Sequence, residues 1–135
     1  MSESKYSLRW ESFKQGDWSK YPYLKNFPLI WKRRNDGYSN GIITVEKDKE
    51  IVGVTLLYYH DISKYIDIDI MEVRSKNIGI GKLMLEYLKK ISDKLKVMLS
   101  VHPMEGTKEY FIRNGFREGD KYVLPLIYGD KKWDI

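Results

Sequence analysis

The chain has 135 residues, of which 42% are hydrophobic and 14% aromatic, a length and composition that suit one folded domain and disfavour intrinsic disorder. It contains no cysteine, which excludes disulfides, thiolate metal sites and a cysteine nucleophile. The formal net charge of +5 suits a polyanionic partner, such as nucleic acid or a phosphorylated cofactor.

The first forty residues predict short elements. Residues 7–10 alternate like a strand. Residues 18–25 predict a helical stretch that Pro22 makes irregular. Residues 27–34 predict a second short helix with Pro28 in its first turn.

The middle of the chain predicts three antiparallel strands. Residues 41–46 and 51–59 are rich in β-branched residues and flank a polar turn, which is the pattern of a hairpin. Residues 65–73 predict a third strand, because hydrophobic and polar residues alternate along it. Its expected faces are Ile66, Ile68 and Ile70 on one side, and Asp67, Asp69, Met71 and Val73 on the other.

The second half predicts two helices and three strands. Apolar residues at i, i+3, i+4 and i+7 predict an amphipathic helix over residues 79–93, followed by a buried strand at residues 95–101. Residues 107–114 predict a last helix that Thr107 caps. Two closing strands are expected around Arg117 and residues 122–124. No repeat or linker is visible, so we expect a single domain over residues 1–135.

The segment Lys76-x-x-Gly79-x-Gly81 joins a strand directly to the long helix. Glycines let the backbone approach a ligand, and the first N–H groups of a helix lack intrahelical partners and carry partial positive charge. With the charges of Lys76 and Lys82 beside them, these groups predict a phosphate cradle. Tight turns alone also explain many such glycine pairs, and the spacing is not that of a P-loop.

Three segments resemble the GNAT superfamily of N-acetyltransferases. Lys76-Asn77-Ile78-Gly79-Ile80-Gly81, at the start of the long helix, is similar to that family's acetyl-CoA signature, [Q/R]-x-x-G-x-[G/A], with Lys76 in place of Gln or Arg. Residues 45–53 resemble its second-to-third strand turn, and residues 110–116 resemble its F-Y-x-x-x-G-F segment. The three segments stand in the family's order and cover about residues 42–126.

The resemblance implies the GNAT fold, an α+β fold with a mixed, mostly antiparallel sheet flanked by helices on both faces. Only the strands at residues 66–73 and 95–101 would be parallel neighbours, and they would splay apart to admit acetyl-CoA. The implied cofactor-binding residues are Met71 and Val73 beside the pantetheine arm, and Lys76, Asn77, Ile78, Gly79, Ile80, Gly81 and Lys82 around the pyrophosphate. No metal site is expected.

The implied reaction moves an acetyl group from acetyl-CoA to a primary amine, on a small molecule or peptide, by direct attack in a ternary complex. Asp67 and Asp69 are the candidate general bases, because the amine must lose a proton. The same pattern also fits two carboxylates that only coat a solvated face. The tyrosine that often protonates the thiolate in this family aligns with Phe111, which has no proton to give, and Tyr110 precedes it as an expected core residue.

Other interpretations stay open. Phe111 leaves room for a non-catalytic acyl-CoA-binding or sensor protein on the same fold. A nucleic-acid-binding module that uses the basic residues 32–34 is a third reading, although solvation explains them more simply. His60 and His102 lack metal-ligand spacing and are expected to be exposed. The longest apolar run, residues 51–59, is well short of the roughly 20 residues of a spanning helix, so we expect a cytoplasmic protein with no membrane partner.

Overall fold

The computed structural model describes residues 6–35, 39–74, 79–119 and 126–129 of the chain. The described strands are β1 Ser7–Ser12, β2 Gly41–Lys47, β3 Glu50–His60, β4 Tyr65–Val73, β5 Met98–Val101, β6 Arg117–Glu118 and β7 Leu126–Tyr128. The described helices are the 3-10 helices η1 Gln15–Lys20 and η2 Pro22–Asn26, and the α-helices α1 Pro28–Lys32, α2 Ile80–Leu95 and α3 Lys108–Arg113.

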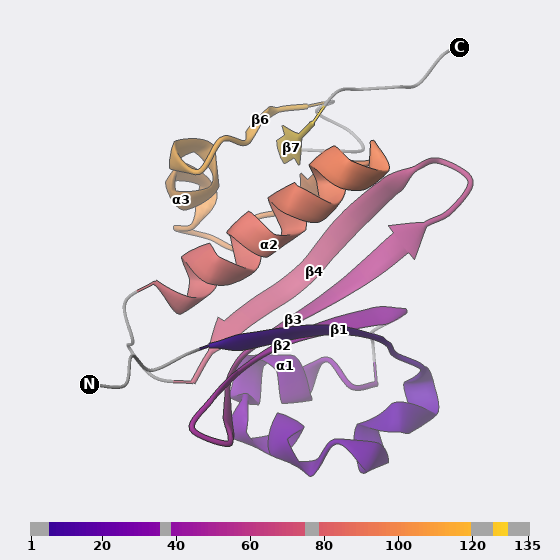
Figure 1. Ribbon diagram of the computed structural model, residues 1–135, viewed down its shortest axis with the longest axis vertical. Helices are drawn as coiled ribbons and strands as arrows, with labels where there is room; N and C mark the ends of the chain where they lie inside the picture. Colours follow the sequence, from indigo (N-terminus) through magenta and orange to yellow (C-terminus); the bar gives the residue numbers. More distant parts are fainter. Residues whose placement is uncertain (1–5, 36–38, 75–78, 120–125, 130–135) are drawn as a thin grey trace.

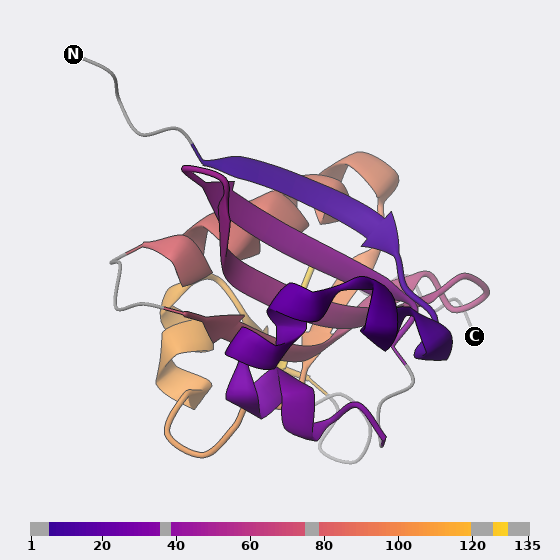
Figure 2. The ribbon, with the colours of Figure 1, turned by 90° about the horizontal axis from the view of Figure 1, so that it is seen from below.

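The described strands form one mixed sheet in the order β1-β2-β3-β4-β5-β7-β6. β4 and β5 are parallel, and the other neighbouring pairs within the described residues are antiparallel. α2 and α3 cover one face of the sheet, whereas η1, η2 and α1 cover the other (Figure 1). Figure 2 shows the same layers from below, with η1, η2 and α1 in front and α2 behind. The predicted fold class is therefore confirmed.

Each face of the sheet carries its own hydrophobic core. α2 buries Ile80, Met84, Leu85 and Leu88 against one face, at the helical spacing predicted from the sequence. On the other face, the core includes Phe13, Trp18, Leu24, Phe27 and Ile30, from the segment that precedes β2. Burial of one large apolar side chain stabilises the fold by roughly 1.5–3 kcal/mol, so these two layers hold the helices firmly on the sheet.

Proline chemistry breaks the predicted helix at residues 18–25 into two 3-10 helices. The α conformation is disfavoured for the residue before a proline, and Tyr21 lies before Pro22. Tyr21 has φ −123° and ψ 75°, which ends η1 and begins η2. The short helix expected at residues 27–34 is present as α1, with Pro28 as its first residue.

The ends of α2 and α3 also differ from expectation. α2 runs two residues further than predicted and ends where Lys96 adopts the left-handed conformation, so β5 begins at Met98. Thr107 is the N-cap residue of α3, but its hydroxyl donates to the Met104 carbonyl oxygen instead of accepting from the helix. Of the two closing strands, that around Arg117 is β6. Residues 122–124 lie outside the described residues, and β7 follows them.

A β-bulge interrupts the alternation of β4. Leu56 of β3 lies opposite Ile70, and Leu57 lies opposite Ile68, so Asp69 is an extra residue in the register. An extra residue shifts the pleat by one position, and the side chains beyond it point to the opposite faces from those that strict alternation assigns.

The bulge overturns the predicted faces of β4. Before the bulge, Ile66 and Ile68 pack in the core under α2. After it, Met71 and Val73 pack against this same core, whereas Ile70 packs in the core on the α1 side. The prediction that grouped Ile66, Ile68 and Ile70 on one face and Asp67, Asp69, Met71 and Val73 on the other is therefore wrong.

Candidate active site

β4 and β5 pair along only the first part of β4. Their parallel register runs from Tyr65 opposite Met98 to Ile68 opposite Val101, where β5 ends. β4 continues to Val73, so in the described part of the chain its second half has no strand beside it on the β5 side. The pairing therefore stops next to the bulge, at the strand pair that the family resemblance expects to splay apart.

A first cleft, of about 520 Å³, occupies this opening. Its walls come from β4, the N-terminal end of α2, the loop after β5, and α3. The predicted cofactor-binding residues that line it are Met71, Val73, Gly79, Gly81 and Lys82. The side chain of Ile80 is instead fully buried in the core under α2. Lys76, Asn77 and Ile78 lie outside the described residues.

The first turn of α2 presents an anion-binding surface to the first cleft. Gly79 is the N-cap residue with φ 101°, a backbone conformation that side chains rarely adopt. The N–H groups of residues 80–82 precede the first intrahelical bond, which runs from the Leu83 N–H to the Gly79 carbonyl oxygen. These N–H groups, the helix dipole and the Lys82 ammonium together suit a phosphate.

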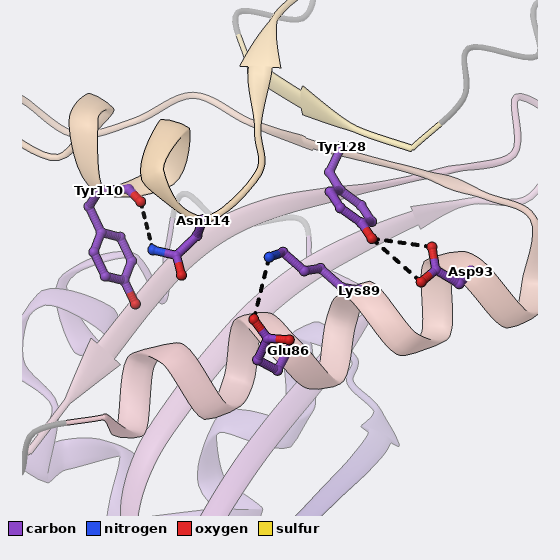
Figure 3. Close-up of polar contacts among 6 residues, drawn as sticks. All are labelled: Glu86, Lys89, Asp93, Tyr110, Asn114 and Tyr128. Atoms are coloured by element: carbon purple, nitrogen blue, oxygen red, sulfur yellow. Dashed lines mark hydrogen bonds and ion pairs between the residues drawn. The ribbon is translucent and has the colours of Figure 1, made fainter.

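Tyr110 is a residue of this site that the sequence interpretation treated as core. It is half-buried and lines the first cleft, and its ring extends from α3 toward α2 (Figure 3). A β-carbon at Gly81 would lie 3.1 Å from its hydroxyl oxygen. Burial raises the pKa of this hydroxyl, so it stays a proton donor at neutral pH.

Phe111 is the neighbour at which the family's usual tyrosine aligns. It is only 7% exposed, and its ring packs edge-on against Phe116 with 5.4 Å between centroids. Because successive residues of a helix point about 100° apart, the hydroxyl of Tyr110 comes from a different side of α3. A sequence reader who placed Phe111 in the core could have inferred that Tyr110, one residue earlier on the same helix, points in another direction. That difference in direction is the signal that could have identified Tyr110.

Polar contacts close the end of α3 and join α2 to β7 (Figure 3). Asn114 donates from Nδ2 to the Tyr110 carbonyl oxygen at 2.7 Å. The ammonium of Lys89 lies over the Tyr128 ring, 5.4 Å from its centroid. The Tyr128 hydroxyl in turn donates to Asp93 of α2 at 3.3 Å. The Asn114 bond thus caps the helix that carries Tyr110, and the other two contacts join β7 to α2.

A second cleft, of about 430 Å³, lies beside β4 and α1. It is lined by Leu29, Arg33, Asp67, Ile68, Asp69, Ile70, His102 and Met104. The bulge residues Ile68, Asp69 and Ile70, together with His102 and Met104, line the first cleft as well. The two clefts therefore meet at the bulge of β4.

Asp69, one of the two predicted bases, is already paired with the guanidinium of Arg33. Arg33 donates from Nε to Oδ2 at 3.2 Å and from Nη2 to Oδ1. The Ser39 hydroxyl donates to Oδ2 at 3.3 Å. Both oxygens of Asp69 are thus occupied by donors from the α1 side, and its carboxylate fixes Arg33 at the rim of the second cleft.

Asp67, the other predicted base, is half-buried and accepts one hydrogen bond. The Ser100 hydroxyl of β5 donates to its Oδ1 at 3.1 Å. Within the described part of the chain, no lysine or arginine forms an ion pair with it. Burial raises the pKa of the Asp67 carboxyl, and the Ser100 hydrogen bond opposes this rise. Asp67 is therefore a carboxylate of the second cleft that forms no ion pair with a lysine or arginine of the described ranges.

Other polar residues near the site have structural contacts. Glu72 lies on the α1 side of β4 and accepts from the Ile30 N–H at 2.9 Å. His102 is exposed, as expected, and it lines both clefts. His60 is half-buried and stacks on Tyr65 with 4.0 Å between centroids, so its expected exposure is wrong.

The basic segment at residues 32–34 is largely engaged within the chain. Arg33 is bound to Asp69, and the guanidinium of Arg34 lies over the Trp31 ring, 4.6 Å from its centroid. These contacts leave the nucleic-acid reading without support. In the described part of the chain, no helix combines the length and hydrophobicity that crossing a membrane requires.

Comparison with known proteins identifies the fold. No protein-family model and no curated protein matches the sequence, whereas many solved structures match the fold. N-acetylglutamate synthase from Neisseria gonorrhoeae, complexed with coenzyme A and N-acetyl-glutamate, has 16% sequence identity and a TM-score of 0.65; the match covers 95% of this chain and 36% of that one. Tetrahymena GCN5 has 15% sequence identity and a TM-score of 0.67; the match covers 97% of this chain and 99% of that one. A GNAT family acetyltransferase from Elizabethkingia anophelis with acetyl-CoA bound has 18% sequence identity and a TM-score of 0.59; the match covers 91% of this chain and 98% of that one.

The chain therefore has the fold of the GNAT N-acetyltransferases, as its three sequence segments indicated. It spans about a third of the N-acetylglutamate synthase chain and nearly the whole of the other two.

Proposed function

We propose that this chain is a cytoplasmic, acetyl-CoA-dependent N-acetyltransferase that acts on a primary amine of a small molecule or peptide. The observation that carries the proposal is the meeting of two clefts at the β4 bulge. One cleft has the anion-binding start of α2, and the other has the half-buried carboxylate of Asp67. The presence of coenzyme A or acetyl-CoA in similarly folded structures supports this assignment.

The first cleft would bind acetyl-CoA. The N–H groups at the start of α2 and the Lys82 ammonium would hold the pyrophosphate, together with the segment Lys76–Ile78 that precedes them in the chain. The backbone of β4 at Met71 and Val73 has no strand on its β5 side among the described residues, so it is available to the amide groups of the pantetheine arm. The Tyr110 hydroxyl would add a donor beside Gly81.

The acceptor amine would enter from the second cleft. Asp67 would take its proton directly or through water, and burial raises the pKa of Asp67 toward the range in which a general base works well. The amine nitrogen then forms a bond to the thioester carbon, and a backbone N–H near Met71 stabilises the oxyanion. Alignment of the two reactants in one complex would supply roughly 7–11 kcal/mol of the barrier reduction.

The C–S bond then breaks, and coenzyme A leaves as a thiolate. Because a free thiol has a pKa near 8.5, this thiolate leaves without obligatory help from an acid. Asp69 was proposed together with Asp67 as a base. Its ion pair with Arg33 fits better with a role in positioning the wall between the two clefts.

The experiment that tests this proposal combines acetyl-CoA binding with amine-dependent release of the coenzyme A thiol. At a hundred times its dissociation constant, acetyl-CoA should stabilise the fold by about 2.7 kcal/mol, which raises Tm by several degrees. Gly81→Asp should abolish this shift, because it places a negative charge in the phosphate cradle. An unchanged shift in Gly81→Asp would show that the cofactor binds elsewhere.

A non-catalytic acyl-CoA sensor is the second candidate, favoured by the burial of Phe111 at the usual tyrosine position. It predicts tight acetyl-CoA binding without transfer to any amine. Thiol release with a broad panel of amines separates the two functions.

A further inference from the structure

The second cleft has a charge and surface pattern that indicates what kind of amine it accepts. Its one described arginine, Arg33, is committed to both oxygens of Asp69. Asp67 is the other carboxylate of this cleft, and among the described residues no lysine or arginine forms an ion pair with it. The cleft therefore offers one place for one ammonium or amine group.

An anionic group on the acceptor would be poorly accommodated in this cleft. A carboxylate or phosphate next to the amine would lie near Asp67, and the positive charge of Arg33 is already balanced by its ion pair with Asp69. Like charges repel each other strongly where water is partly excluded. A second ammonium group, as in a polyamine, would also be poorly accommodated, because the second carboxylate of the cleft, Asp69, is already paired with Arg33.

Apart from His102, the remaining lining residues of the second cleft are apolar. Leu29 of α1 and Met104 of the loop after β5 line it, with 42% and 53% of their surface exposed. They are two of only five large hydrophobic residues that are exposed in the described part of the chain. Ile68 and Ile70, both buried, line it as well. Exposed apolar side chains that gather at a cleft are a usual sign of contact with an apolar ligand.

We propose that the acceptor is a small primary monoamine with an apolar body and no anionic group beside the amine. This inference rests on the proposed acetyltransferase function and names the substrate class of the same site. The amine would lie at Asp67, and the apolar body would lie between Leu29 and Met104.

The test compares acceptors that share one body and differ in charge. With saturating acetyl-CoA, kcat/KM is measured by thiol release for 2-phenylethylamine, L-phenylalanine and L-phenylalaninamide. The amino acid adds a carboxylate to the body of 2-phenylethylamine, and the amide has nearly the same size without that charge. We expect 2-phenylethylamine to exceed phenylalanine at least tenfold, and phenylalaninamide to recover most of the difference.

Variants of Leu29 link this preference to the second cleft. Leu29→Ala should raise KM for 2-phenylethylamine several-fold more than KM for ethylamine, which lacks the apolar body. Leu29→Arg introduces a guanidinium that Asp69 does not engage, and it should shift the preference toward phenylalanine at least tenfold. The matched control is Ile62→Ala, because Ile62 is 94% exposed and lines neither cleft; its kinetics should equal those of the parent chain.

The outcomes separate this inference from the proposed function. Absence of both an acetyl-CoA-dependent Tm shift and transfer overturns both. Transfer that prefers phenylalanine, or a spermidine rate above that of 2-phenylethylamine, overturns the acceptor class alone and leaves the acetyltransferase in place. Equal preference in Leu29→Arg and the parent chain places the acceptor body elsewhere and overturns the inference.

Discussion

The hydroxyl oxygen of Tyr110 lies 3.1 Å from the position that a β-carbon would take at Gly81. The two residues face each other across the first cleft, one from α3 and the other from the first turn of α2. Such a distance is shorter than ordinary van der Waals contact, so glycine at residue 81 makes room for the hydroxyl beside the N–H groups that are proposed to bind phosphate.

Gly81→Ala should weaken acetyl-CoA binding with little effect on the stability of the unliganded fold. The new methyl group would push the Tyr110 hydroxyl aside and narrow the approach to the α2 amides, and alanine is itself a good helix former. We expect the acetyl-CoA-dependent Tm shift to fall by more than half, as measured by differential scanning fluorimetry.

A double variant separates the two causes of this loss. Gly81→Ala with Tyr110→Phe removes the hydroxyl that the methyl group meets, and it should recover part of the Tm shift. Gly16→Ala is the matched control, because no atom lies within 4 Å of a β-carbon there. A double variant no better than Gly81→Ala would mean that the Tyr110 contact is irrelevant to binding.

Asp67→Asn should lower kcat by roughly ten- to ten-thousand-fold, because an amide cannot accept the amine proton. Acetyl-CoA affinity should change little, since Asp67 lines the second cleft and not the first. Steady-state kinetics of Asp69→Asn provide the comparison. If Asp69→Asn loses kcat and Asp67→Asn keeps it, the assignment of the base is reversed.

Ser100→Ala should change the pH dependence of kcat/KM. A general base works in its ionised form, so activity is lost as the pH falls through the pKa of Asp67, which burial raises. The Ser100 hydrogen bond lowers this pKa, so Ser100→Ala should raise it and move the acidic limb of the profile to higher pH. Ser39→Ala removes an equivalent hydroxyl from Asp69 and should leave that limb in place. Equal shifts in both variants would contradict the assignment of Asp67 as the base.

Glu72→Ala should destabilise the fold without affecting acetyl-CoA. It leaves the Ile30 N–H without its acceptor, which costs about 1–2 kcal/mol and lowers Tm by several degrees. Glu72 lines neither cleft, so the Tm shift on addition of acetyl-CoA should be retained. Glu72→Gln keeps a carbonyl acceptor and should recover part of the stability. Loss of the acetyl-CoA shift in Glu72→Ala would show that α1 and the cofactor site are coupled.

The sequence predicts the elements of this fold better than it predicts the site. The apolar spacing of α2 is a local property of one segment, and the structure buries Ile80, Met84 and Leu88 as that spacing requires. The faces of β4 depend on its register with β3, which inserts Asp69 as an extra residue. The apolar residues change phase at Ile70 and Met71, but this change alone does not show which residue is the extra one.

The contacts that distinguish the two candidate bases, Asp67 and Asp69, also cannot be predicted from the residues next to them in the chain. Arg33 and Asp69 are far apart in the chain, and they meet only because α1 packs on the bulged half of β4. Alignment with a family motif located an aromatic pair at Tyr110 and Phe111. Both residues line the first cleft in the structure, but Phe111 is buried in the core and Tyr110 alone of the two carries a hydroxyl.

The bulge of β4 also sets how this protein can change over evolutionary time. Beyond it, the side chains of Met71 and Val73 point toward α2, and both residues line the cleft that is proposed to bind acetyl-CoA. Leu29 and Arg33 of the α1 segment, together with Asp67, line only the cleft that is proposed for the acceptor. Under the proposed function, substitutions at Leu29 and Arg33 would therefore change the amine specificity while the residues proposed to bind the cofactor stay the same.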